Sequence, residues 1–218
     1  MSFFNYSEPL LRKRQEEVES QNLCGLVRLH WQIKNLTLFS GFYTRIDQAF
    51  ILWGLISLGI FATAQFLPIS WSSQAILWSA FTLVGIVGMV TLTWFWVSVE
   101  RLRWIVYSWV VLMLAGLTLT DLGIFLGWGE ILMHLCPMWL GLSAIGYGFT
   151  GLGMRSRTFV LMGLVHLLGI LVLPYCGSMQ FLSTGLIMTI SLLLLAQIEW
   201  DMRPSVTAMV IAIPHSNN

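Results

Sequence analysis

The segment Gly127–Arg157, GWGEILMHLCPMWLGLSAIGYGFTGLGMRSR, decides the fold of this chain. It opens with an ionisable pair, Glu130 and His134, which share a helix face because they are four residues apart. Pro137 follows and predicts a kink, because proline removes an i→i−4 hydrogen bond from a helix. Small residues then recur every three or four positions, which predicts a smooth face for close helix packing in a bilayer. That face is formed by Gly141, Ala144, Gly148 and Gly151.

The composition predicts a polytopic membrane protein. Of 218 residues, 57% are hydrophobic and only 10% are charged, and the mean hydropathy is +0.79. In a typical soluble domain, about a quarter of the residues are charged. Six apolar segments are long enough to cross ~30 Å of hydrocarbon as helices. They are approximately residues 49–67, 74–97, 104–126, 131–153, 159–173 and 181–198. We therefore predict an all-α protein with six transmembrane helices.

The positions of the basic residues predict the orientation. With six spans, all eleven Lys and Arg residues fall on the same side of the membrane. The positive-inside rule then places both the N- and C-termini in the cytoplasm, or on the equivalent stromal side. The expected location is a bacterial inner membrane or a thylakoid-type membrane. The expected organisation is a cytoplasmic segment over 1–46, a six-helix bundle over 47–200 and a cytoplasmic tail over 201–218.

A short amphipathic helix is predicted before the first span. Leu26, Leu29, Ile33 and Leu36 are spaced by three, four and three residues, as on one face of a helix. A helix over residues 23–36 with this face could lie on the cytoplasmic membrane surface. The alternative is that it caps the bundle from below.

Three ionisable residues lie near the outer ends of spans three and four, namely Asp121, Glu130 and His134. Ionisable groups inside a membrane are costly, so they are candidates for function. One interpretation is a proton or cation relay, or an electrostatic clamp for a partner. The other is a solvated rim with one buried hydrogen bond. If a relay exists, the side chains of Asp121 and His134 should approach each other.

His166 is the candidate cofactor ligand, because it lies mid-span with Gly163 and Gly169 three residues to either side. This small-residue environment leaves room for haem or chlorophyll on the imidazole, and His134 is a second candidate. The alternative is a neutral histidine that bonds to a neighbouring helix. Ser143 lies at a similar depth on the preceding span, which predicts a Ser143–His166 hydrogen bond. No metal-binding motif occurs in the sequence, so no metal site is expected.

Two short motifs resemble the rhomboid intramembrane proteases. Gly141-Leu-Ser143 in span four is similar to the family's GxS motif, and Val99-Glu100-Arg101 is similar to its charged turn after the second helix. The resemblance implies that Ser143 is the nucleophile candidate. The family's catalytic histidine lies in the sixth helix, and residues 181–198 contain none. The resemblance therefore implies a catalytically inactive relative that binds membrane partners.

These features predict a non-enzymatic accessory or assembly protein that docks laterally on other membrane proteins. In one version of this prediction, the protein also binds a tetrapyrrole. The glycine-rich faces suit helix–helix contact, and span three adds Gly123 and Gly127 to them. The alternatives are a small-solute transporter or channel, and a rhomboid-like hydrolase. The expected partners are membrane lipid and other integral membrane proteins, and no nucleic acid.

The predicted topology can be tested with cysteine labelling. Cys24 precedes the first span and Cys176 lies in the last outer connection. An impermeant thiol reagent should label Cys24 only from the cytoplasmic side, and Cys176 only from the opposite side. Labelling of Cys24 in intact cells would contradict the six-span topology.

Overall fold

The computed structural model describes residue 4 and residues 9–13, 27–33 and 36–201. Its elements are β1 (Leu11–Lys13), β2 (Val27–Ile33), β3 (Leu36–Tyr43), α1 (Arg45–Phe66), α2 (Trp71–Val99), α3 (Arg103–Phe125), α4 (Gly129–Met133), α5 (Leu135–Met154), α6 (Arg157–Val172), the 3-10 helix η1 (Leu173–Met179), α7 (Gln180–Gln197) and β4 (Ile198–Trp200).

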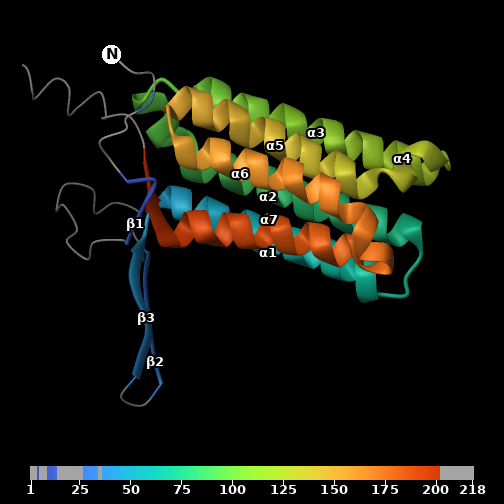
Figure 1. The fold of residues 1–218 in the computed structure, drawn as a ribbon, viewed down its shortest axis with the longest axis horizontal. Helices are drawn as coiled ribbons and strands as arrows, with labels where there is room; N and C mark the ends of the chain where they lie inside the picture. Colours follow the sequence, from blue (N-terminus) through green and yellow to red (C-terminus); the bar gives the residue numbers. More distant parts are fainter. Residues whose placement is uncertain (1–3, 5–8, 14–26, 34–35, 202–218) are drawn as a thin grey trace, which may run out of the picture.

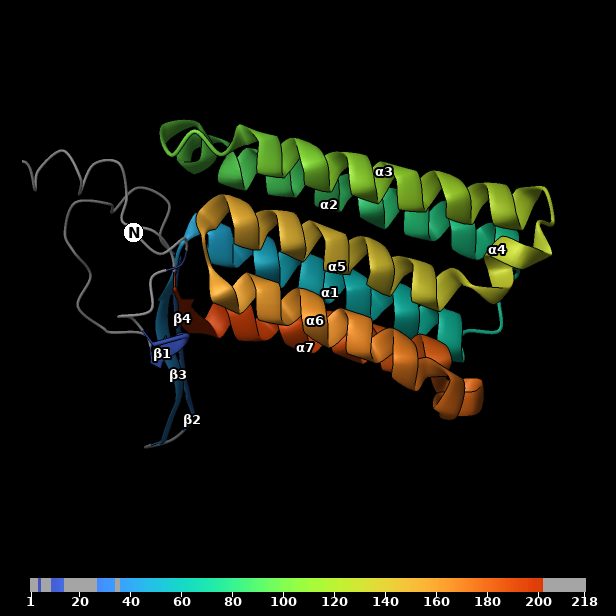
Figure 2. The same cartoon turned by 45° about the horizontal axis from the view of Figure 1, so that its top comes forward.

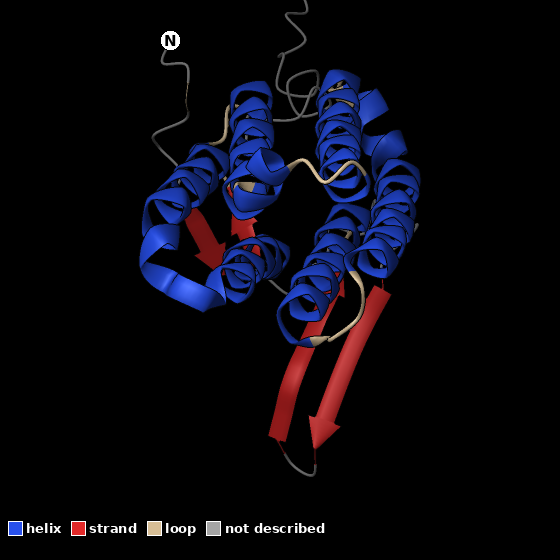
Figure 3. Ribbon diagram, turned by 90° about the vertical axis from the view of Figure 1, so that its right-hand side faces the viewer, coloured by secondary structure: helices blue, strands red, loops and turns tan. Residues whose placement is uncertain are grey.

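The long helices run roughly parallel or antiparallel in one bundle (Figure 1). Each packs on the next in the order α1, α2, α3, α5, α6 and α7, and α7 packs along α1 to close the ring. Figure 2 shows the same neighbours from another side, and Figure 3 looks along the helices. We call the end with the strands and the start of α1 the terminal end, and the end with α4 and η1 the distal end (Figure 1).

Within the described residues, five helical stretches are long and apolar enough to cross a membrane. Four are α1, α2, α3 and α5, and the fifth is Arg157–Gln197, which joins α6, η1 and α7. Gly177 breaks the fifth stretch with φ 53° and ψ −122°, a conformation open to glycine, and the chain folds back there. Large apolar side chains such as Val87 and Phe95 stay exposed, at 64% and 72%. A helical, apolar protein of membrane type is thus confirmed in this coarse form.

The helix predicted over residues 23–36 is wrong in its described part. Residues 27–33 and 36–43 are the antiparallel strands β2 and β3, with Val27 opposite Tyr43 and Ile33 opposite Leu36. The sequence of β2, VRLHWQI, alternates apolar and polar residues with the period of a strand. Its β-branched and aromatic residues also favour strand. Of the residues that fit the helical spacing, Leu29 and Ile33 also fit the period of two, because they are four residues apart.

The kink predicted at Pro137 lies three residues earlier, at His134. The chain ends α4 at Met133, takes φ −108° and ψ 17° at His134, and restarts α5 at Leu135. Pro137 is therefore in the first turn of α5, where a helix does not need the missing N–H.

Tryptophan–threonine hydrogen bonds join neighbouring helices. Trp109 Nε1 of α3 donates to Thr150 Oγ1 of α5 at 2.9 Å, and Trp139 Nε1 of α5 donates to Thr120 Oγ1 of α3 at 3.2 Å. Trp78 of α2 donates to Thr63 of α1 at 3.0 Å. Each threonine hydroxyl in turn donates to a carbonyl oxygen of its own helix. All these polar groups are thereby paired inside the bundle, as an apolar surrounding requires.

Glycines make room for two of these indoles. A Cβ at Gly146 would lie 2.6–2.7 Å from three ring carbons of Trp109, and one at Gly116 would lie 2.9 Å from Trp139. Each glycine precedes the partner threonine by four residues, so both lie on one helix face. The α3–α5 interface is therefore built from two reciprocal contacts of an indole with glycine and threonine.

Gly141 and Gly151 of α5 face α6. A Cβ at Gly151 would lie 2.7 Å from Val160 Cγ2, and one at Gly141 would lie 3.9 Å from Ile170. From the α6 side, a Cβ at Gly163 would lie 3.1 Å from the Ala144 carbonyl oxygen. It would also lie 3.7 Å from the Gly148 nitrogen. In α3, a Cβ at Gly123 would lie 3.0 Å from Ile131 of α4.

Gly127 does not belong to a packing face. It lies beyond the end of α3 with φ +64°, and a Cβ at this position would meet no atom of the described residues within 4 Å. Its function is to let the chain leave α3 in a left-handed conformation.

Gly146 and Gly148 provide a matched test of the α3–α5 contact. Both lie in α5, so alanine should raise helix propensity equally, by about 1 kcal/mol. A Cβ at Gly146 would strike the Trp109 ring, whereas one at Gly148 would meet nothing within 4 Å in the described part of the chain. We expect Gly146→Ala to lower the melting temperature in detergent and Gly148→Ala to keep or raise it. Equal melting temperatures for the two variants would contradict the interface.

Candidate functional site

A cavity lies at the centre of the helix ring. Its volume is about 110 Å³, enough for several waters or part of a small organic molecule. Every long helix contributes to its wall. The residues nearest the terminal end include Val97, Ile105 and Phe159, and the deepest include Ser57 and Met113. The cavity therefore extends from the terminal end to the middle of the bundle.

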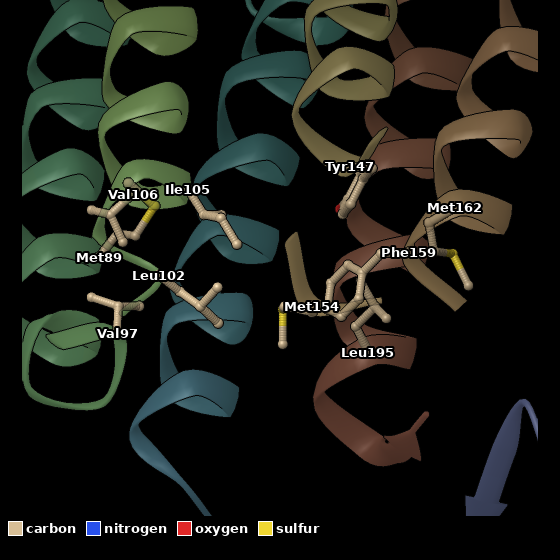
Figure 4. Packing of buried hydrophobic residues seen from close by; sticks show 10 residues of the cluster. All are labelled: Met89, Val97, Leu102, Ile105, Val106, Tyr147, Met154, Phe159, Met162 and Leu195. Atoms are coloured by element: carbon tan, nitrogen blue, oxygen red, sulfur yellow. The ribbon is translucent and has the colours of Figure 1, made fainter. Parts of the chain in front are cut away.

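The wall is predominantly apolar and carries no Asp, Glu, Lys or Arg among its described residues. Methionines and aromatic rings predominate in it. Figure 4 shows side chains of this region from two sides of the ring. Met89 and Ile105 belong to α2 and α3, whereas Tyr147 and Phe159 belong to α5 and α6. Such a wall suits an uncharged, lipophilic molecule.

His166 places an unpaired acceptor in this wall. The residue is fully buried, and its Nδ1 lies 2.8 Å from the Met162 carbonyl oxygen. Because a carbonyl only accepts, Nδ1 carries the proton and Nε2 of the neutral ring presents a lone pair. No described residue hydrogen-bonds to Nε2. The Tyr147 ring packs on the imidazole at a centroid distance of 4.9 Å and holds its orientation.

Trp53 places an unpaired donor in the same wall. Its Nε1 is buried and has no hydrogen-bond partner in the described part of the chain. The indole ring packs over Gly85 of α2, where a Cβ would lie 3.0 Å from two of its carbons. An indole N–H can only donate, so any partner must bring an acceptor.

The predicted Ser143–His166 hydrogen bond is wrong. Both residues are buried and line the cavity, but His166 donates from Nδ1 to the carbonyl oxygen of Met162, and its Nε2 has no partner among the described residues. A helical histidine reaches the carbonyl one turn earlier at no cost in packing, whereas Ser143 belongs to another helix. The serine–histidine contact that activates a serine nucleophile is therefore not formed.

The cavity meets one requirement of a tetrapyrrole site. A histidine ligand usually donates its second ring nitrogen to a backbone carbonyl or carboxylate, as His166 does to Met162, and leaves the other lone pair for the metal. Haem also brings two carboxylates, and the described wall has no cation to pair them. The residues thus suit an uncharged ligand better than haem.

Of the outer residues Asp121, Glu130 and His134, Asp121 and His134 hydrogen-bond to different groups. Asp121 of α3 accepts from Ser79 Oγ of α2 at 3.0 and 3.2 Å. His134 Nδ1 lies 2.8 Å from the Glu130 carbonyl oxygen, and both side chains are exposed. Among the described residues, no three His, Cys, Asp or Glu side chains are placed to hold a metal ion. This arrangement fits a solvated rim with one polar contact between helices.

The floor of the cavity lies at the terminal end. Trp200 of β4 lines the cavity and packs edge-on against Phe159, with ring centroids 4.9 Å apart. β4 pairs with β1, with Trp200 opposite Leu11. The backbone of Leu11–Lys13 thus lies beside the floor of the cavity.

Asp201 holds this floor against α6. The carboxylate is 1% exposed and accepts hydrogen bonds from Ser156 Oγ and from the backbone N–H groups of Arg157 and Thr158, at 2.9–3.0 Å. It also accepts from Arg157 Nε at 2.9 Å. Burial alone would raise the pKa of Asp201, but the hydrogen bonds from Thr158 and Arg157 outweigh it and lower the pKa to about 2. The carboxylate therefore caps the first turn of α6 as an anion.

Sequence reasoning missed Trp53, Trp200 and Asp201 as parts of the site. Trp53 resembles the other mid-span tryptophans, and only the absence of a hydroxyl partner among the described residues distinguishes it. Asp201 lies three residues after the last predicted apolar segment, a position typical of a solvated end, and the groups that donate to it lie in the distant turn at Ser156–Thr158.

Neutralising Asp201 should loosen the floor. Folding lowers its pKa, so the ionised form stabilises the fold fully above the unfolded pKa of about 4, and this stabilisation is lost as the pH falls towards about 2. We expect Asp201→Asn to cost about 2 kcal/mol at neutral pH, or about 4–8 °C in melting temperature. Below about pH 4 the difference from wild type should shrink. Glu130→Gln, at an exposed carboxylate, is the control and should change little.

The chain matches no protein-family model, no curated protein and no solved structure.

Proposed function

We propose that this chain is a non-enzymatic integral membrane protein that binds an uncharged lipophilic molecule at the centre of a six-span bundle. The observation that carries the proposal is the central cavity, which all the long helices line and in which no described residue is charged. Dense packing between helices stabilises a membrane helix bundle. A cavity that remains between six packed helices therefore supports a binding site for a ligand.

The proposed topology has six spans with both termini on the cytoplasmic or stromal side. Arg45 opens α1, Arg101 and Arg103 lie at the α2–α3 turn, and Arg155 and Arg157 lie at the α5–α6 turn. All five positions belong to the terminal end. The positive-inside rule supports this end as the cytoplasmic one, in a bacterial inner membrane or a thylakoid-type membrane.

The proposal of a non-enzymatic function is supported by the positions of Ser143 and His166. The two side chains line one cavity without a hydrogen bond between them, since His166 Nε2 has no partner among the described residues. A rhomboid-like hydrolase would need a base on its serine and a supply of water. The apolar wall favours a lipophile over water at this depth.

A second candidate function is docking on another membrane protein, as an accessory or assembly subunit. The observation that favours it is the hairpin of β2 and β3, which extends away from the helices (Figures 1 and 3). In the described residues this sheet has only two strands, so both outer edges offer backbone N–H and C=O groups. Exposed strand edges are sites at which a partner can add a strand.

The ligand can be sought directly in the purified protein. Wild-type protein in a mild detergent should retain one lipophile close to stoichiometrically, identified by solvent extraction and mass spectrometry. Ser143→Met should lower this retention, because the longer side chain enters the cavity from its wall. Ser191→Met is the matched control, since Ser191 is also buried but does not line the cavity.

Three outcomes separate the functions. Identical bulk lipid in wild type and Ser143→Met would contradict ligand binding in the cavity. A visible absorption band in the wild-type protein would identify a tetrapyrrole. A stoichiometric protein partner with an empty cavity would favour the docking function.

A further inference from the structure

We infer that the ligand is an uncharged ring lipophile that bears a hydroxyl group, a phenol or quinol in chemical class, whose hydroxyl donates to His166 Nε2. This inference rests on the proposed ligand-binding function and adds the chemistry of the ligand. Its basis is the set of unpaired polar atoms in the described wall, the absence of charge there and the aromatic lining.

The charge of the wall excludes ionic head groups. None of the described residues that line the cavity is Asp, Glu, Lys or Arg. A phosphate or carboxylate in this space would have no counter-charge, and burying an unpaired charge in an apolar site is very costly. The polar part of the ligand must therefore be neutral.

The hydrogen-bonding capacity of the wall requires a donor on the ligand. Nδ1 of His166 donates to Met162, so Nε2 can only accept in the neutral ring. Trp53 Nε1 can only donate. A hydroxyl both donates and accepts, so it is the simplest neutral group that meets both needs. A ketone, ester or ether would leave Nε2 unpaired.

Trp53 and His166 lie at similar depths in the bundle. Trp53 is eight residues past the start of α1, and His166 is nine residues past the start of α6. Both helices start at the terminal end, so these residues lie about 12 and 14 Å along them. The two residues therefore line the cavity at a similar level, and the rest of the ligand would lie against apolar wall.

The unpaired state of Trp53 is exceptional among the mid-bundle tryptophans. Trp78, Trp109 and Trp139 each donate to a threonine of the neighbouring helix. The chain thus supplies an acceptor to each of these three buried indole N–H groups. At Trp53, which lines the cavity, no described residue supplies one. The hydroxyl of the inferred ligand would supply one.

The shape of the wall favours a ring over an open chain. Seven of its residues are Phe, Trp or Tyr, and Phe159 and Trp200 meet edge-on at the floor. Aromatic walls contact a planar ring through offset and edge-on arrangements that a flexible chain does not offer.

Three probes with one tail and different heads test the inference on the full-length protein in lipid nanodiscs. 4-Nonylphenol can donate and accept, 4-nonylanisole can only accept, and nonylbenzene can do neither. Each competes against radiolabelled 4-nonylphenol in a scintillation proximity assay, at matched mole fraction in the bilayer. For wild type we expect nonylphenol to bind about tenfold more tightly than nonylanisole, and nonylanisole more tightly than nonylbenzene.

Two variants assign the head-group contacts. His166→Phe keeps a ring of similar size and should weaken nonylphenol about tenfold, to the affinity of nonylanisole. Trp53→Phe should weaken nonylanisole to the affinity of nonylbenzene and leave the advantage of the phenol over the anisole. Ser143→Met should weaken all three probes equally, because it occupies space and offers no specific contact.

The outcomes distinguish the two levels of the proposal. Equal binding of all three probes to wild type would overturn the hydroxyl inference and leave the lipophile-binding function standing. Saturable binding of none of them would overturn both. Because the wild-type comparison needs no variant, a folding defect in His166→Phe does not remove the test.

Discussion

The pairing of buried polar groups within the bundle is the constraint on which this structure depends. Hydrocarbon offers no hydrogen-bond partner, so the chain itself supplies one to most of the described indole and hydroxyl groups between the helices. Thr150 meets this need twice, because it accepts from Trp109 of α3 and donates to the Gly146 carbonyl of its own helix. The same arrangement recurs in reverse with Trp139 and Thr120. The positions of α3 and α5 are thereby fixed in rotation as well as in depth.

The central cavity follows from how the helices are paired. α1 packs closely with α7, since a Cβ at Gly185 would lie 2.5 Å from Phe61 Cβ, and α5 packs closely with α6 through Gly151 and Gly163. These glycine contacts bring the backbones together at the edge of the ring, and large side chains such as Met113 are left to fill the centre. They do not fill it. The polar atoms that remain unpaired in the described wall, at Trp53 and His166, therefore lie where a ligand has room.

Composition predicts the apolar helices well, because length and hydropathy alone determine whether a segment can cross a bilayer. The local secondary structure and the positions of helix breaks were less predictable. Leu29 and Ile33 fit both a helical and a strand spacing, and the helix break is at His134 rather than at Pro137 because a proline is tolerated in a first turn. The site could be predicted only in part. His166 stands out in the sequence as a mid-span histidine, whereas Trp53 differs from Trp109 only in lacking a threonine across the described interface.

The floor of the cavity is held by a different interaction from those in its wall. Wall contacts are neutral, since a charge among apolar side chains would be very costly. The floor lies beyond the ends of the apolar helices, where the Asp201 carboxylate receives two backbone N–H groups of α6 and the Arg157 guanidinium. The Thr158 hydroxyl lies 2.6 Å from the Leu10 carbonyl oxygen and 2.7 Å from Asp201 Oδ1. One ionic cap thus joins the last strand, the first strand and the start of α6, and it fixes Trp200 at the base of the cavity.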